Sequence, residues 1–260
     1  MLEHLTAIRF QKVMGSGRTQ PCLMMCEDEA GQEREVVVKL RGHPQIMPGG
    51  LAAEGVASLL GRDLGLPVQC PLMIWMDQDF VDTVPDAGMR SMMEKSIGWN
   101  FGSPKWSPGY TIWPHDQPLS EAMRVAAAEI FVFDGIIQNP DRRDANPNCV
   151  FLGDCFLIYD HESAFSGFRD LFPKDPWEDG AVDFLKNHVL FRSLKKSDVY
   201  GLERFLRSWE SLDESKLSSY IDWVPEEWDS SNVSRRLIVD YLRSCLPHFD
   251  DVKNQILSLL

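Results

Sequence analysis

A polar loop in the middle of the chain carries residues that could transfer a phosphoryl group. The stretch NPDRRDANPN, residues 139–148, lies between two strongly apolar segments, and Asn146 follows Asp141 by five positions. A carboxylate can accept the proton of an attacking hydroxyl, and a nearby amide oxygen can hold Mg²⁺. Arg142 and Arg143 could contact phosphate or an acidic substrate, or could be solvated or paired with nearby acids. A turn rich in Asn, Asp and Pro can also simply link two elements.

Three charged residues outside this loop could complete such a site. Lys39 closes the β-branched run REVVVK, Glu54 lies on the helix predicted next, and Asp160 ends the apolar run CFLIYD. An ion pair between Lys39 and Glu54 would aim the ammonium at nucleotide phosphates, and a carboxylate at a strand end can bind a metal. Alone, each has an ordinary explanation as a solvated strand end, an exposed helical acid or a strand terminator. Their order, with Asp-x4-Asn and a hairpin in between, favours a single site.

A glycine-containing turn near the N-terminus is a further candidate. The segment MGSGRTQ contains Gly15, Ser16 and Gly17, but Gln20 stands where a G-x-G-x-x-G loop would have its third glycine. Such a loop could bring backbone N–H groups to phosphates. It could equally be a plain hairpin turn.

The elements that would position these residues are predicted mainly as strands in the first half of the chain. β-rich runs separated by turn clusters predict a meander of antiparallel strands at Leu5–Val13, Pro21–Glu27 and Glu33–Arg41. Apolar residues at helical spacing predict a helix at about Gly50–Leu64, where the sequence Gly-Leu-Pro follows. The run VQCPLMIWM, residues 68–76, is typical of a strand.

The second half is predicted to be mainly helical. Residues 77–118 show no clean period and no element is predicted there, whereas Leu119–Gln138 predicts a buried helix with Ser120 as a possible cap. The runs CVFLG and CFLIYD predict a hairpin that turns at Gly153 and Asp154. Amphipathic spacing predicts four more helices, at about Lys196–Leu212, Glu214–Trp223, Asn232–Leu246 and Asp250–Leu260. Strands followed by helices indicate an α+β fold, with two lobes as the expected arrangement.

Composition narrows the function classes. The chain has 260 residues, 44% of them hydrophobic, a formal net charge of −13 and a sequence pI near 4.9. This acidity opposes direct contact with nucleic acid or with an anionic membrane, but local cations or a metal could still cradle a nucleotide. Six cysteines without C-x-x-C spacing predict neither a zinc site nor a disulfide framework. We expect a cytoplasmic protein without a membrane span or a leader.

Four stretches between Val36 and Phe165 resemble the protein-kinase-like superfamily, and within it the HipA-like kinase family. They are VVVKLRG, AAEGVASLLGRDLGLPV, FDGIIQNPDRRDANPN and FLIYDHESAF. The resemblance implies a bilobal kinase fold, with a β-rich N-lobe at residues 1–117 and a helical C-lobe at residues 118–260. ATP would lie in the cleft between them.

The same resemblance implies a role for each candidate residue. Lys39 would contact the α- and β-phosphates of ATP, and Glu54 would steady it. Asp141 would be the catalytic base. Asn146 and Asp160 would bind one or two Mg²⁺ ions, although D-H-E stands in this sequence where many kinases have D-F-G.

The resemblance says less about the role of the glycine loop and about which molecule accepts the phosphoryl group. Gly15, Ser16 and Gly17 would cover the phosphates, and Ser16 or Thr19 could itself be phosphorylated. The favoured function is an ATP- and Mg²⁺-dependent serine/threonine protein kinase of HipA-like type. A kinase acting on a small molecule is one alternative, and a nucleotide-binding pseudokinase in a toxin–antitoxin or defence system is another.

Overall fold

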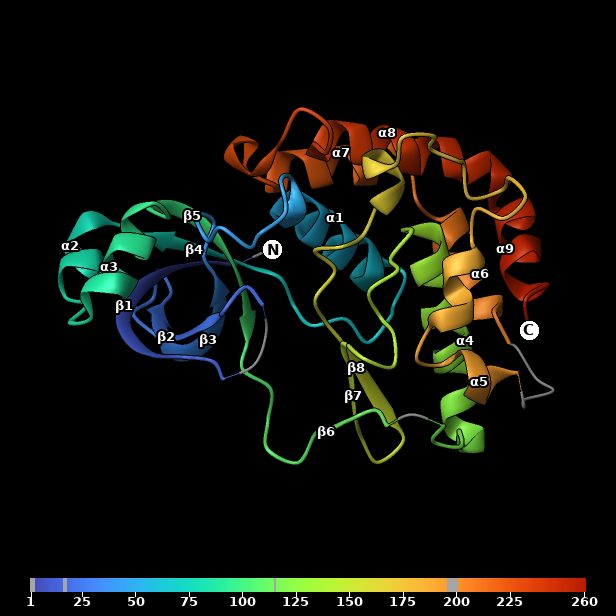
Figure 1. Cartoon of the computed structure of the whole chain (residues 1–260), viewed down its shortest axis with the longest axis horizontal. Coiled ribbons are helices and arrows are strands. Elements are labelled where there is room, and N and C mark those ends of the chain that lie inside the picture. The colour runs from blue at the N-terminus through green and yellow to red at the C-terminus, as the bar shows by residue number, and fades with distance from the viewer. Residues whose placement is uncertain (1–2, 16–17, 115, 196–200) are drawn as a thin grey trace.

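The computed structural model of the chain describes residues 3–15, 18–114, 116–195 and 201–260. A β-barrel built from the first part of the chain lies at one end of the molecule, and a group of helices lies at the other end (Figure 1). A small three-stranded sheet and helix α1, Gly50–Asp63, lie between them.

The barrel is closed by five strands in the order β1-β2-β3-β5-β4. Their bounds are His4–Val13 for β1, Cys22–Glu27 for β2, Glu33–Lys39 for β3, Leu72–Met76 for β4 and Gly98–Pro104 for β5. The predicted antiparallel meander is confirmed for β1, β2 and β3. Its closure was not predicted, because β1 and β4 pair in parallel and β5 comes from the unassigned residues 77–118.

Short elements connect the barrel strands and the small sheet. Helices α2 (Gln78–Asp82) and α3 (Ala87–Glu94) follow β4, and each begins at an aspartate, Asp77 or Asp86, whose side chain accepts a backbone N–H. Strand β6, Thr111–Ile112, then pairs with β7, Cys149–Leu152, in the small sheet. These elements also lie in the unassigned segment, where caps rather than periodicity mark the helices.

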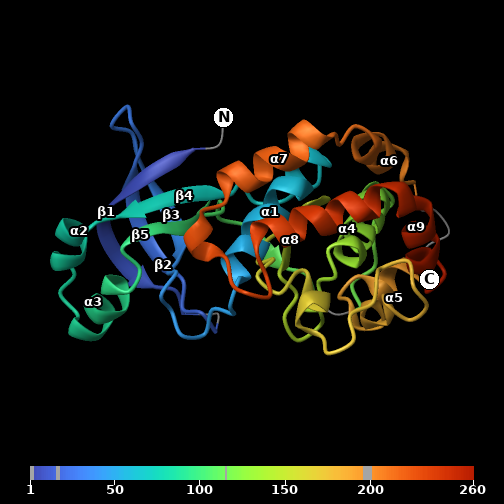
Figure 2. The ribbon, with the colours of Figure 1, turned by 90° about the horizontal axis from the view of Figure 1, so that it is seen from above.

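Helix α1 is the structural centre of the molecule. Every residue from Gly50 to Gly61 is buried, including Glu54 and Ser58. The helix packs against α7 (Glu214–Trp223) and α8 (Arg235–Cys245), which cover it in the view from above (Figure 2). The predicted helix is confirmed, but it is buried on all sides because small residues at Ala52, Ala53, Gly55 and Ala57 allow neighbours to approach from each face.

The buried helix of the second half is shorter than predicted. A 3-10 turn at Glu121–Met123 precedes α4, which runs from Arg124 to Ile136. Ser120 does stand at the N-cap position of this 3-10 turn, but its side chain makes no capping bond, and its hydroxyl donates to Asp154 Oδ1 at 2.7 Å. The helix nevertheless ends directly before the polar loop, as the sequence predicted.

The predicted hairpin is confirmed. Strand β7, Cys149–Leu152, pairs with β8, Cys155–Ile158, across the two-residue turn at Gly153 and Asp154. Gly153 has a φ of 59°, a backbone conformation that glycine adopts without a Cβ clash. Together, α4 and this hairpin hold the two ends of the polar loop.

The remaining helices follow the predicted order. Glu214–Trp223 is confirmed as α7, the prediction for Asn232–Leu246 corresponds to α8, and that for Asp250–Leu260 corresponds to α9. Helix α6 covers the later part of the predicted Lys196–Leu212, whose first five residues lie outside the described residues. The other elements are α5 (Phe191–Leu194), α6 (Glu203–Glu210), α9 (Phe249–Leu257) and the 3-10 turns Ser166–Arg169, Asp183–Asn187, Glu226–Trp228 and Leu246–His248.

Two clusters of buried apolar residues hold these elements together. One fills the barrel with residues such as Met24, Val36 and Ile74, and the other spans α1, α4 and the C-terminal helices. Helix α1 therefore packs with the helical part, although it lies within the segment predicted as the N-lobe. Among the described residues, no helix combines the length and apolar character needed to cross a membrane.

Candidate active site

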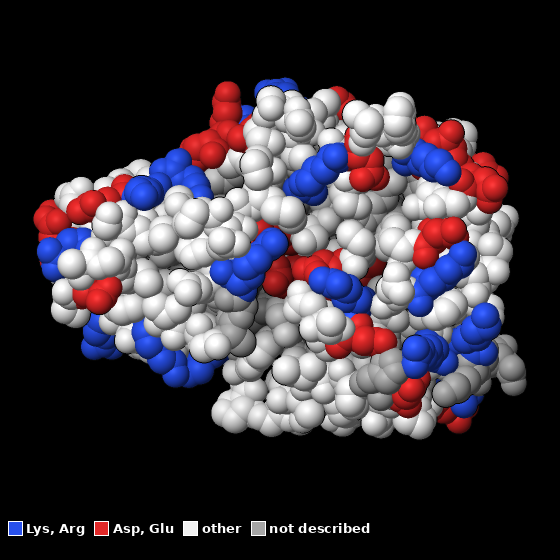
Figure 3. Space-filling view, in the orientation of Figure 1, with Lys and Arg blue, Asp and Glu red and all other residues white. Residues whose placement is uncertain are grey.

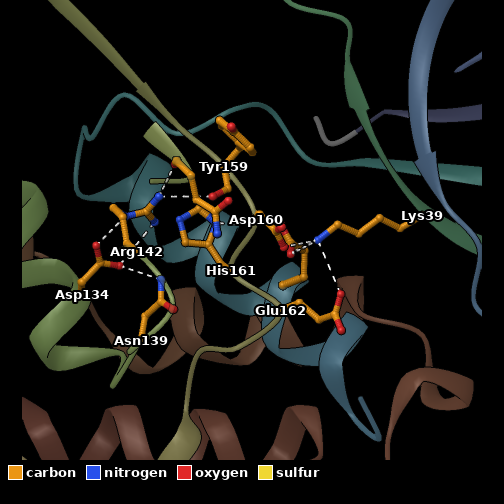
Figure 4. A network of polar contacts seen from close by, with 10 residues as sticks. Lys39, Asp134, Asn139, Arg142, Tyr159, Asp160, His161 and Glu162 are labelled. Atoms are coloured by element: carbon orange, nitrogen blue, oxygen red, sulfur yellow. Dashed lines mark hydrogen bonds and ion pairs between the residues drawn. The ribbon is translucent and has the colours of Figure 1, made fainter. Parts of the chain in front are cut away.

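Lys39 meets two carboxylates that come from different elements. It is the last residue of β3, and its Nζ lies 2.7 Å from Glu54 Oε2 on α1 and 2.6 Å from Asp160 Oδ1, two residues after β8. Figure 4 shows the lysine reaching from its strand toward Asp160. Three residues proposed from the sequence are thus brought to one point.

Charge pairing dominates the electrostatics of this contact. Burial alone would lower the pKa of Lys39, but the carboxylates of Asp160 and Glu54 outweigh it and raise that pKa, so the ammonium is charged. Burial would raise the pKa of Glu54, yet the ammonium and His161 hold that pKa at about 2. Because both groups are ionised, the lysine presents a fixed positive charge.

A third carboxylate, Glu162, was not predicted as a site residue. Its Oε2 lies 3.8 Å from Lys39 Nζ, while Oε1 accepts the backbone N–H of Met47 at 3.1 Å. Burial raises its pKa. A side chain at Gly50 would place its Cβ 2.7 Å from the Cγ of Glu162, so the glycine makes room for this acid at the start of α1. The only sequence signal was the D-H-E string.

The polar loop brings its two predicted residues together. Asn146 Nδ2 donates to Asp141 Oδ2 at 2.9 Å, and backbone bonds between Arg143 and Asn146 close a turn between them. Asn139 Oδ1 accepts the backbone N–H of Asp141 at 3.3 Å. The carboxylate and the amide are therefore held in a defined turn rather than on an open loop.

Arg142 joins this loop to the strand end that carries Asp160. Its guanidinium is completely buried and donates to Asp134 Oδ2 at 2.6 Å, to the carbonyl of Tyr159 at 3.2 Å and to the carbonyl of Asn148. Figure 4 shows the arginine among these groups. Of the roles considered for Arg142, which were contact with phosphate or substrate, solvation, and pairing with a nearby acid, the structure shows the pairing with an acid. Arg142 therefore links the loop that carries Asp141 to the strand end that carries Asp160.

Asp134 anchors the same network from α4. Besides Arg142, it accepts from Asn139 Nδ2 at 3.0 Å, and its Oδ2 lies 2.9 Å from His188 Nε2. Burial would raise the pKa of Asp134, but Arg142 and His188 hold it well below its ordinary value. Neither Asp134 nor His188 was predicted, because Asp134 lies in an apolar run and His188 follows the polar pair Lys186 and Asn187, and neither context marks a buried polar residue.

The backbone around the loop is bent at its junctions. Gln138 after α4, Asn148 before β7 and Asp160 after β8 have φ values of 48°, 44° and 59°. Asn and Asp adopt this left-handed conformation more readily than most residues. Such conformations cost about 1–3 kcal/mol each and persist where surrounding contacts enforce them, as the buried Arg142 network does here.

The donor set of the site fits Mg²⁺. Asn146 uses its amide nitrogen for Asp141 and so turns its carbonyl oxygen elsewhere, and Asp160 offers two carboxylate oxygens, of which Oδ1 accepts from Lys39. In the described ranges, no group of three His, Cys, Asp or Glu side chains could hold a metal. Mg²⁺ needs no such cage, because it commonly binds one or two carboxylates together with phosphate oxygens and water.

The predicted glycine loop is described only in part. Gly15 is exposed, and a Cβ built there would meet nothing within 4 Å. Ser16 and Gly17 lie outside the described residues, so their predicted contact with phosphates stays a prediction. Thr19, the other residue suggested for phosphorylation, is buried.

Comparisons with solved structures show which folds this chain resembles. The structure is similar to that of the Helicobacter pylori proinflammatory kinase CtkA, with a TM-score of 0.54, 16% identity and complete coverage of both chains, which shows a protein-kinase-like fold. A Golgi casein kinase with Mn/ADP bound matches with a TM-score of 0.45 and 10% identity, over 100% of this chain and 73% of that one. An apo pseudokinase matches with a TM-score of 0.36 and 12% identity, over 99% and 97%.

Sequence comparison identifies the family. No curated protein matches the chain. The family model described as HipA-like kinase matches residues 7–251, which is most of the chain. The predicted resemblance is therefore confirmed, and the chain belongs to the HipA-like kinase family.

Proposed function

We propose that the chain transfers the γ-phosphoryl group of ATP, with Mg²⁺, to a serine or threonine hydroxyl of a protein. The observation that carries this proposal is the meeting of Lys39 Nζ with Glu54 and Asp160, at 2.7 and 2.6 Å, from three separate elements. Phosphoryl transfer relies on positioning and on charge stabilisation, and this arrangement supports both.

Each residue has a defined task in this mechanism. Lys39 contacts the α- and β-phosphates, with Glu54 fixing the direction of its ammonium. Asp141 accepts the proton of the attacking hydroxyl as the new oxygen–phosphorus bond forms, while the bond from the γ-phosphorus to the β,γ-bridging oxygen breaks and ADP leaves. Asn146 and Asp160 would hold Mg²⁺, which when bound neutralises charge on the phosphates.

The Lys39–Asp160 ion pair also has a consequence for nucleotide binding. Both groups are assigned to the triphosphate or its metal, so each must share its charge with the ligand when ATP binds. Lys39 keeps Glu54 as a buried partner throughout, at 2.7 Å. The ammonium would therefore stay compensated by Glu54 if Asp160 held Mg²⁺, which avoids an unpaired buried charge.

Two substitutions test the assignment. Asp141→Ala is expected to lower phosphoryl transfer by about 10²–10⁴-fold while ATP·Mg²⁺ binding, measured by calorimetry, changes little. Asp160→Ala is expected to weaken nucleotide binding in the presence of Mg²⁺. Asp154→Ala is the control, because Asp154 lies in the exposed turn between β7 and β8. It should change neither the rate of phosphoryl transfer nor the binding of nucleotide. Unchanged turnover in Asp141→Ala would contradict the mechanism.

The protein acceptor rests on the family assignment, and a direct measurement decides it. Mass spectrometry after incubation with ATP labelled in the γ-phosphoryl group would locate the label on protein hydroxyls. Label recovered only on a small molecule would instead assign a small-molecule kinase.

A further inference from the structure

Two adjacent apolar side chains in the segment after β8 project into solvent. Leu171 and Phe172 are 85% and 84% exposed, whereas the next most exposed large apolar side chain of the described residues, Ile112, is 57% exposed. Single apolar residues at a surface are common, but a contiguous pair left in water is typical of a contact surface. We call Leu171 and Phe172 the apolar pair.

The loop that carries the apolar pair is held at its base. The carbonyl of Gln138 accepts the backbone N–H of Ser166 at 3.2 Å, and the side-chain Nε2 of Gln138 donates to the carbonyl of Lys174 at 3.0 Å. Pro173 directly follows Phe172, so it fixes its own φ and disfavours helical backbone at Phe172. The pair is therefore presented by a preorganised loop, which reduces the entropy lost when it binds.

An apolar groove of about 280 Å³ lies among α6, the 3-10 turn Leu246–His248 and the start of α9. Two of its eight lining residues, Glu210 and Asp250, are acidic. The other six are apolar: Leu206, Trp209, Leu212, Leu246, Pro247 and Phe249. A cavity of about 150 Å³ accommodates benzene, so this groove has room for a phenylalanine ring and a second apolar side chain.

The loop and the groove are neighbours on the surface. The ring of Trp177, five residues after Phe172, stacks on the ring of His248 with centroids 4.2 Å apart and an interplanar angle of 20°. His248 ends the 3-10 turn whose Leu246 and Pro247 line the groove. Figures 1 and 2 show the yellow segment near residue 175 beside α9 at the helical end of the molecule. One face of the molecule can therefore present both features to the same partner.

The segment around the apolar pair carries no net charge, although the whole chain has a formal net charge of −13. Arg169 and Lys174 balance Asp170 and Asp175. Among the described residues, neither Lys174 nor Glu210 at the groove forms an ion pair, so the two can pair when the surfaces meet. Figure 3 shows Lys and Arg side chains interspersed with Asp and Glu over the helical end. Two copies therefore repel each other less here than their net charges alone would imply.

We propose that two copies of this chain associate through this surface, with the apolar pair of each copy seated in the groove of the other. The occupant of the groove is a second copy because one molecule carries both parts of the contact, close together and matched in size. A two-fold axis uses each part twice, which doubles the apolar contact and closes the assembly at a dimer. The inference goes beyond the proposed kinase function and does not depend on it.

Sedimentation velocity of the full chain over a range of concentrations tests the proposal. We expect a concentration-dependent species of twice the chain mass of 29.6 kDa and no larger species. Phe172→Ser should weaken the dimer at least about tenfold, because both contacts lose their aromatic anchor. Ile112→Ser is the matched control, since Ile112 is also apolar and exposed but lies on β6, and it should leave the dimer dissociation constant unchanged.

A variant of the groove makes the pairing itself testable. Pro247→Glu places a carboxylate in the groove wall and should also weaken the dimer at least about tenfold. Both positions are exposed, so the melting temperatures should stay near that of the wild type. A mixture of Phe172→Ser and Pro247→Glu, with one variant fluorescently labelled, brings one unaltered apolar pair to one unaltered groove. The mixed dimer should therefore be tighter than the dimer of either variant alone.

Each possible failure overturns a defined part of the proposal. A chain that stays monomeric at all concentrations would overturn the association itself. A dimer that Phe172→Ser leaves unchanged would place the interface elsewhere. A mixture that associates no more tightly than the separate variants would overturn the pairing of loop with groove, and species that keep growing beyond the dimer would overturn the two-fold closure.

Discussion

Arg142 and Arg143 are neighbours in the sequence, yet they have opposite roles. Arg142 is completely buried and paired with Asp134 at 2.6 Å, whereas Arg143 is 54% exposed beside Asp141. The difference arises because Arg143 bonds through its backbone to Asn146, which turns its side chain outward while that of Arg142 lies between the loop and β8. One arginine thus fixes the loop, and the next lies at its surface beside Asp141.

Loss of the buried guanidinium should be costly. Arg142→Met leaves Asp134 without its main counter-ion and removes the donor to Asn148 and Tyr159, so we expect the free energy of unfolding to fall by about 3–5 kcal/mol. Urea unfolding followed by circular dichroism measures this change. Arg143→Met is the control and should change stability by less than about 1 kcal/mol, because its ion pair is exposed.

A double-mutant cycle separates this coupling from a general packing loss. Arg142→Met alone leaves the carboxylate charge of Asp134 unpaired. In the double variant Arg142→Met, Asp134→Asn, that charge is absent. The double variant should therefore be less destabilised than the sum of the single variants. Strict additivity would mean that the two side chains do not stabilise each other, and the network described above would be wrong.

The sequence predicted the residues that meet at Lys39 but not those that hold them. Lys39, Glu54 and Asp160 could be proposed because charged residues at element ends, in a fixed order, are a recognisable pattern. Glu162 and His188 carry no such pattern. Their importance follows from burial and from contacts across 54 or more residues of chain, such as that between His188 and Asp134, which no local spacing reveals.

At the scale of elements, helix α1 links the site to the helical part. It carries Glu54 and packs on α7 and α8, and its small residues allow this close approach. At Gly61, a Cβ would lie 2.5 Å from Val68 Cγ2 and 3.2 Å from the ring of Phe133. The direction of Glu54 therefore depends on packing well away from the site.

Gly61→Ala tests that dependence. The clash should cost about 1–3 kcal/mol, more than the roughly 1 kcal/mol that alanine gains over glycine inside a helix, so the melting temperature should fall. Binding of ATP·Mg²⁺ should weaken as α1 shifts. Gly88→Ala, on the peripheral helix α3, is the comparison and should leave nucleotide binding unchanged. A stabilised Gly61→Ala protein would show that the neighbours of α1 yield easily.

Element predictions succeeded where local patterns decide the structure. The hairpin at Gly153 and Asp154 and the helix Glu214–Trp223 were predicted from turn residues and apolar spacing alone. The failures lie in residues 77–118, where two short capped helices and β5 alternate too quickly for a period to emerge. Ser120 stands at the predicted N-cap position but makes no capping bond, and its hydroxyl donates to a distant acid, Asp154.

At the scale of the whole molecule, long-range pairing explains what could not be predicted. The barrel closes through the parallel pairing of β1 with β4 and through β5 inserted between β3 and β4. The pairs β1–β4 and β3–β5 join residues far apart in the chain, such as His4 with Met73 and Val36 with Pro104, and no local signal specifies them. The boundary between the two lobes predicted at residue 117 stays a prediction. Helix α1, which precedes that residue in the chain, packs with the apolar cluster of α4 and the C-terminal helices.

The buried charge network makes global stability depend on pH. Burial lowers the pKa of His188 below its ordinary value of 6.5, so the folded protein resists the proton that the unfolded chain accepts. Stability is thus fully present above pH 6.5 and declines as pH falls below it, by at most about 1.4 kcal/mol per pH unit for this one group. Glu54, with a pKa of about 2, adds a second loss between about pH 4.5 and 2.

Comparison of the wild type with His188→Asn between pH 7.5 and 5.0 tests the first window. The variant loses the contact with Asp134 and should be less stable at pH 7.5 by about 1–3 kcal/mol, but its free energy of unfolding should fall less steeply on acidification. His43 is also buried and has a lowered pKa, so it accounts for the pH dependence of stability that remains in the variant. Identical slopes in the two proteins would show that the folded protein takes up the proton at His188 as readily as the unfolded chain does.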